Sequence, residues 1–143
     1  MVEAYPKQLK LVFKQYPLSF HQNARPSAIA TLAAQRQGKF WQMHDLIFKN
    51  QATIKNPQGE YRFEEFAKTL GMDVDKFQKD MKDPALDKII ADDIKAGADA
   101  QVTGTPSLFL NGKKINDRSL PGLKKLIDAE LAPPKPGATA SKK

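Results

Sequence analysis

The sequence of 143 residues contains no cysteine. This absence excludes disulfide bonds, thiolate catalysis and thiolate metal sites within these residues. Histidine is also scarce, since His21 and His44 are the two in the chain. Two histidines in different predicted elements are weak evidence for a metal site. We therefore expect no metal and no other cofactor.

Long apolar runs are absent as well. No stretch approaches the roughly 20 apolar residues of a transmembrane helix, so no membrane partner is expected. The N-terminus lacks the apolar segment of a secretory signal peptide, and as written the chain would stay in the cytoplasm. The sequence also has no glycine-rich phosphate loop, no Ser/His/Asp spacing and no paired-carboxylate pattern.

Charge is moderately basic, with 23 basic and 16 acidic residues and a net charge of +7. Lys135, Lys142 and Lys143 belong to a proline-containing tail, residues 132–143, whose composition predicts disorder. The other basic residues are interspersed with acids. A basic excess raises nucleic acid as a partner, but no basic block or stripe is present. A solvated surface is favoured, and nucleic acid stays a distant alternative.

The most informative stretch is a predicted hairpin near the C-terminus. Residues 107–110 form a short apolar run, and residues 113–115 are the predicted returning strand. Between them stands Asn111-Gly112, a pair typical of type I′ turns because both central residues need a positive φ. Residues 9–14 alternate apolar and polar side chains and predict one further strand.

Between residues 23 and 131 the spacing of apolar residues predicts about five helices before the hairpin and one after it. Predicted capping residues stand at the starts of four of these helices: Asn23, Asp73, Asp83 and Ser119. In the helix at residues 39–50, a stripe of apolar and aromatic residues is interpreted as core rather than as a ligand box: Phe40, Trp41, His44, Ile47 and Phe48.

Two polar features on the predicted helices have more than one interpretation. A histidine on an apolar helical face, as at His44, is more often a satisfied core residue than a ligand or base. Asp92-Asp93 could hold a charge near the sheet, but a solvated helix face is the favoured interpretation.

Gly104-Thr105-Pro106, followed by an apolar strand and a hairpin, resembles the cis-proline loop of thioredoxin-fold proteins. Three further stretches, 13–21, 38–45 and 71–73, are similar to DsbA-like thiol–disulfide oxidoreductases. The resemblance covers about residues 9–131. It implies an α/β, thioredoxin-like fold that is mostly helical with a small sheet. The implied domains are a partial thioredoxin-like domain at 1–22 and 99–131 and a helical insertion at 23–98.

The resemblance also shows what this chain lacks. The family's chemistry is done by a CxxC pair at the N-terminus of the first helix, and the first strand and that helix would precede residue 2. In the thioredoxin fold this strand lies between the strands expected at 9–14 and 107–110. Its absence would leave two edges with unpaired backbone groups. Either the two strands pair directly, or a second copy completes the sheet in a homodimer, which we favour.

Three functions remain open at this point. The chain is part of a DsbA-like oxidoreductase that lost its dithiol unit, or a redox-inactive relative that binds unfolded or extended polypeptides like a chaperone, or a self-associating interaction protein. By resemblance, Gly104, Thr105 and Pro106 are the peptide-docking residues. The alternative is that they only start the strand. The family usually works outside the cytoplasm, so the compartment is left open.

Overall fold

A computed structural model describes residues 1–132 of the chain, so the predicted tail from residue 133 onward lies outside the described residues. Contacts divide the chain into two compact units. Unit 1 contains residues 1–13 and the segment from Val102 onward, and unit 2 contains residues 14–101. The domain boundaries expected near residues 22 and 98 stay a prediction.

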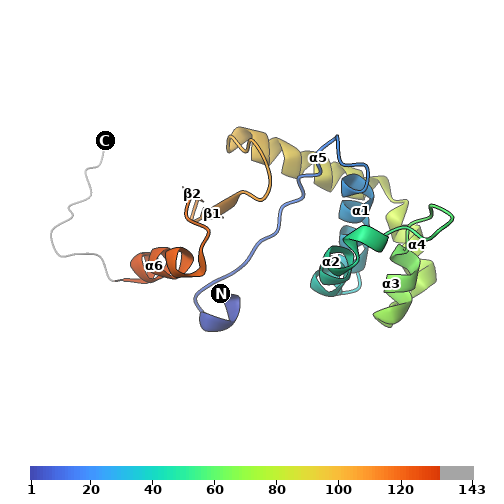
Figure 1. Ribbon diagram of the computed structural model, residues 1–143, viewed down its shortest axis with the longest axis horizontal. Helices are drawn as coiled ribbons and strands as arrows, with labels where there is room; N and C mark the ends of the chain where they lie inside the picture. The colour runs from blue at the N-terminus through green and yellow to red at the C-terminus, as the bar shows by residue number, and fades with distance from the viewer. Residues whose placement is uncertain (133–143) are drawn as a thin grey trace. The chain divides into compact units, whose positions relative to one another are not determined.

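Unit 2 is helical, and the figure shows its helices in blue to gold (Figure 1). The helices are α1 (Ala24–Gln35), α2 (Phe40–Lys49), α3 (Phe63–Thr69), α4 (Val74–Met81) and α5 (Pro84–Asp99), with a short 3-10 turn at Gln51–Thr53. Their apolar faces form one core, in which Met43, Phe77, Leu86 and Ile90 are the largest fully buried side chains. The helices from α1 to α5 follow the predicted order.

Local capping chemistry explains where these helices begin and end. Asp73 accepts a hydrogen bond from the Lys76 amide at the start of α4, and Asp83 accepts one from the Ala85 amide at the start of α5. Gly71, which follows the C-cap residue of α3, has a φ of +65°, a conformation that glycine adopts without strain. These predictions are confirmed. Asn23 is different, because its side chain accepts from the Tyr61 hydroxyl and makes no cap.

The core face of α2 corrects the predicted aromatic stripe. Met43 and Ile47 are the buried residues of this helix, whereas Trp41 is 41% and Phe48 is 57% exposed. The predicted core position of these two rings was therefore wrong. The His44 ring, half-buried rather than enclosed, lies 4.5 Å from the Phe48 ring. Helical spacing correctly predicted that α2 has an apolar face. The buried side of the helix is defined by Met43 and Ile47, which are four residues apart.

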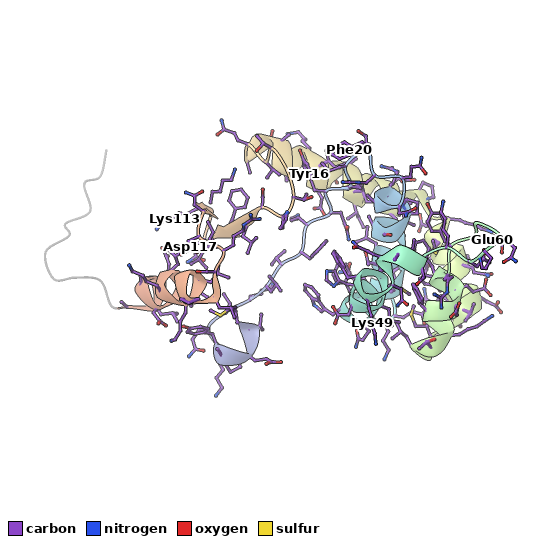
Figure 2. The ribbon with its side chains drawn as sticks, in the orientation of Figure 1. Tyr16, Phe20, Lys49, Glu60, Lys113 and Asp117 are labelled. Carbon is purple, nitrogen blue, oxygen red and sulfur yellow. The ribbon has the colours of Figure 1, made fainter. Side chains whose placement is uncertain are left out.

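The segment that precedes α1 also differs from its prediction. Residues 9–18 form no strand, and Leu11 and Val12 are 57% and 62% exposed. The backbone amide of Gln15 donates to the carboxylate of Asp93 on α5 instead of to a neighbouring strand. Tyr16, labelled in Figure 2, lies against Gly97 of α5. A Cβ atom added to Gly97 would come within 2.5 Å of the Tyr16 ring.

Unit 1 is built from a hairpin and one helix. β1 (Leu108–Leu110) and β2 (Lys113–Ile115) pair antiparallel, and α6 (Leu120–Leu131) follows. Asn111 and Gly112 have φ values of +48° and +80°, which confirms the predicted turn. Ser119 caps α6 by accepting from the Gly122 amide. Within residues 1–132 the sheet has two strands, so the direct pairing of 9–14 with the hairpin is not formed.

Polar contacts hold the pieces of unit 1 together. The Tyr5 hydroxyl, just after the 3-10 turn at Val2–Ala4, donates to Asp128 of α6 at 2.6 Å. Lys124 pairs with the same carboxylate at 3.2 Å. Two residues further along α6, Glu130 accepts from Asn111 and from Lys113, a residue labelled in Figure 2. The hairpin and the N-terminal turn are thus both fastened to one helix.

Replacing Tyr5 by phenylalanine is expected to remove a pH-dependent part of the stability of unit 1. The Tyr5 hydroxyl and then the Lys124 ammonium lower the pKa of Asp128. This contribution is complete above the ordinary pKa of 3.8 and is lost as the pH falls through the lowered value. The hydrogen bond to Asp128, with burial, raises the pKa of Tyr5, so its contribution is complete below 10.0 and is lost at higher pH.

The measurement is the midpoint of thermal unfolding of wild-type protein and of Tyr5→Phe across the pH range. The difference in unfolding midpoint between the two proteins should be constant between pH 3.8 and pH 10.0. It should disappear as the pH falls through the lowered pKa of Asp128 or rises through the raised pKa of Tyr5. Tyr61→Phe serves as the control, because its hydroxyl contacts Asn23 in unit 2. A difference that stays constant into acid would contradict the assigned hydrogen bond.

Candidate functional site

The loop that leads into β1 has a defined conformation. The Thr105–Pro106 peptide bond is cis. The Ser107 hydroxyl donates to the Gly104 carbonyl oxygen at 2.7 Å, and the Arg118 guanidinium donates to the Pro106 carbonyl oxygen at 2.9 Å. Both hydrogen bonds are accepted by backbone carbonyl groups, so they stabilise the backbone conformation of the loop.

A cavity of about 330 Å³, open to solvent, lies along this loop. Its lining comes from the loop, from β2 and from the residues after β2: Thr103, Gly104, Thr105, Pro106, Ser107, Lys114, Ile115, Asn116 and Arg118. All of these belong to unit 1. The structure therefore brings Gly104, Thr105 and Pro106 together on one accessible surface.

Gly104 stands out among the lining residues. A Cβ placed there would meet nothing within 4 Å, and its φ is not in the positive region that favours glycine. The fold of unit 1 therefore does not itself require glycine at this position. The open space beside it suits the close approach of another backbone.

The sheet offers a binding edge beside the same loop. β1 pairs with β2 on one side, and no strand within residues 1–132 pairs with its other side. An edge strand of this kind is a template for an added extended segment, which would gain main-chain hydrogen bonds. The cavity lies next to residue 107, directly before β1.

The hairpin register adds two residues that sequence reasoning missed. Lys114 lies opposite Phe109, and directly opposed side chains share a face of the sheet. Lys114 and Arg118 both line the cavity and are exposed. The alternation of β2 could have placed Lys114, but only the folded return of the chain brings Arg118 to the loop.

The other polar candidates do not join this site. His21, His44 and Asp92 belong to unit 2, and Asp92 pairs with Lys88 on the exposed surface of α5. Asp93 is buried and accepts from Lys14 and Gln15, so its predicted place on a solvated face was wrong. Across residues 1–132 no three metal-ligating side chains cluster. In the same residues, no helix has the length and apolar character needed to cross a bilayer.

Comparison with known proteins agrees with this architecture. The family model described as "DSBA-like thioredoxin domain" matches residues 3–128. A segment of 103 residues is 31% identical to a probable disulfide bond formation protein D of Bacillus anthracis and covers 68% of this chain and 46% of that protein. No solved structure matches the chain.

Longer proteins contain similar segments. A 107-residue segment is 35% identical to the Na(+)/H(+) antiporter NhaA 3 of Salinispora tropica, and a 110-residue segment is 34% identical to NhaA 1 of Salinispora arenicola. Each match covers 74% of this chain but 16% of the antiporter. The similarity to these proteins is therefore confined to a small part of their length.

Proposed function

Because this chain belongs to the family of DSBA-like thioredoxin domains, we propose that it is the peptide-docking part of a thiol–disulfide oxidoreductase. The observation that carries the proposal is the loop at Gly104, Thr105 and Pro106, which lines an open cavity and leads into β1, a strand that has one unpaired edge within residues 1–132. An extended polypeptide would add to this edge and present a disulfide or thiol to the reactive pair of the complete enzyme.

The redox step itself needs a cysteine pair that these 143 residues do not contain. In that chemistry a thiolate of lowered pKa at a helix N-terminus attacks one sulfur of a disulfide. A mixed disulfide forms, the other sulfur leaves as a thiolate, and the second cysteine resolves the intermediate. No side chain in the sequence replaces such a pair, so the isolated chain is expected to be redox-inactive.

The intact mass of the protein from its source cells tests the oxidoreductase proposal. We expect a mass above 15.9 kDa, larger by at least a strand and a helix, with two positions that take a thiol label after reduction. A mass equal to that of Met1 to Lys143, with no thiol label, would contradict it. The redox-inactive alternative, a peptide-binding or chaperone-like module, would then be the better account of the same loop.

Peptide docking is tested separately on the 143-residue chain. Gly104→Ala tests docking specifically. The added methyl group would meet no protein atom within 4 Å, but it would clash with the backbone of a docked polypeptide. We expect it to weaken binding of an unfolded, cysteine-free polypeptide about tenfold, or about 1.4 kcal/mol. Replacing Thr105 or Pro106 should weaken binding as well. Saturable binding by fluorescence anisotropy is the readout, and no binding at any practical concentration would remove the docking proposal.

A second copy of the chain is another extended partner that the edge of β1 could accept. We propose a homodimer formed by sheet completion or exchange of strands, since an exposed strand edge is a template for pairing with another chain. Light scattering at high protein concentration should then give twice the mass of one chain. A mass of one chain under these conditions would contradict self-association.

A further inference from the structure

We propose that the cavity beside the Gly104–Pro106 loop takes an aspartate or glutamate side chain of the docked polypeptide and holds it between Lys114 and Arg118. The inference rests on the proposed peptide docking and adds a substrate class to it, namely extended segments with a carboxylate near the docked residues. The evidence is the charge, pairing and placement of the side chains around the cavity.

Charge is distributed unevenly between the two units. Residues 1–13 and 102–143 contain ten basic and four acidic residues, whereas residues 14–101 contain thirteen basic and twelve acidic residues. Almost all of the net positive charge therefore belongs to the unit that carries the cavity. Such a field draws acidic ligands toward the site.

The two cations that line the cavity, Lys114 and Arg118, have no carboxylate partner in the described part of the chain. Lys113, their neighbour on β2, is neutralised by Glu130 at 2.7 Å. Lys114 and Arg118 form no ion pair within residues 1–132, and the Arg118 guanidinium has one hydrogen bond, to the Pro106 carbonyl. The remaining N–H groups of Arg118 can serve a ligand, and a planar guanidinium suits a carboxylate.

The acidic residue next to Arg118 in the sequence is bonded to the start of α6. Asp117, labelled in Figure 2, follows β2 and accepts from the amide of Ser119 at the start of α6. Its contacts with the Ser119 side chain and amide lower its pKa. Among residues 1–132, no acidic residue lines the cavity. The described lining is therefore cationic and contains no carboxylate that would neutralise Lys114 or Arg118.

Arg118 links the cationic site to the docking loop. One of its nitrogens holds the Pro106 carbonyl, so the guanidinium is fixed beside the residue at which an extended peptide would dock. A carboxylate bound there would contact Arg118, which holds the loop, and Lys114 of β2. The residues that orient the loop would thereby also select the ligand.

The test compares short capped peptides that differ in one residue, Asp or Asn, each carrying a neutral dye. The 143-residue chain at low ionic strength should bind the Asp peptide about fivefold tighter, as expected for one exposed charge-assisted contact. Lys114→Gln should reduce this preference, because it removes one of the two cations that would hold the carboxylate. Lys125→Gln, which removes an exposed charge from α6, is the matched control and should keep the preference.

Each other result overturns the inference in a recognisable way. Equal binding of the two peptides, with Gly104→Ala still weakening both, would leave docking intact and reject the carboxylate site. No binding of either peptide would reject docking and the site together. A single-stranded oligonucleotide that displaces the peptide with the same dependence on Lys114 would show a general polyanion site. A preference seen only for a free C-terminal carboxylate would reject the side-chain assignment.

Discussion

Phe77→Ala is expected to lower the free energy of unfolding of unit 2 by about 3–5 kcal/mol, the usual cost of deleting a fully buried phenylalanine ring. The Phe77 side chain is 0% exposed. It lies on α4, which contacts both α1 and α3, and it belongs to the buried core cluster of the unit. Such a loss is a large share of the stability of a small unit.

The measurement is equilibrium unfolding in urea, followed by the helical circular dichroism signal. Phe48→Ala provides the matched control, since it removes the same ring from an exposed position on α2. We expect the control to change the free energy by less than about 1 kcal/mol. Comparable losses in the two variants would show that the core of unit 2 is not organised around Phe77.

Local chemistry explains which features of the fold could be predicted from sequence. The turn at Asn111-Gly112 and the caps at Asp73, Asp83 and Ser119 depend on residues within three positions of each other. The family resemblance likewise rests on short motifs, and the family match over residues 3–128 confirms it. Features of this kind need no knowledge of tertiary packing.

The errors share a different cause, which is competition between distant partners. The alternating pattern at residues 9–14 predicted a strand, but a strand needs a neighbour, and within residues 1–132 none pairs there. Trp41 and Phe48 have the helical spacing of a core face, yet Met43 and Ile47 occupy it. Apolar spacing alone does not say which of two adjacent stripes meets the neighbouring helices.

The candidate site also combines features set by local sequence with features set by tertiary structure. Gly104, Thr105 and Pro106 were predicted from a contiguous motif, and the structure places them together along the cavity. Lys114 and Arg118 were missed because their relation to the loop depends on hairpin register and on the return of the chain before α6. The proposed carboxylate site therefore became visible only in the folded unit 1.

Asp93→Ala is expected to destabilise unit 2 by about 1–3 kcal/mol, whereas Asp92→Ala, its neighbour in sequence, should change stability by less than about 0.5 kcal/mol. Asp93 is 7% exposed and accepts from the Gln15 amide at 2.9 Å and from Lys14 at 2.7 Å. Gln15 is itself buried. Removing the carboxylate leaves its amide without this acceptor, and an unsatisfied buried donor is costly.

Urea unfolding of the two variants gives the comparison, and Asp93→Asn separates hydrogen bonding from charge. The amide oxygen of asparagine can still accept from Gln15 but cannot pair with Lys14, whose side chain is 64% exposed. If the buried amide dominates, Asp93→Asn should recover most of the loss. If Asp93→Asn is as unstable as Asp93→Ala, the charge matters more than the amide. Equal effects at positions 92 and 93 would mean that Asp93 does not fasten residues 14–15 to α5.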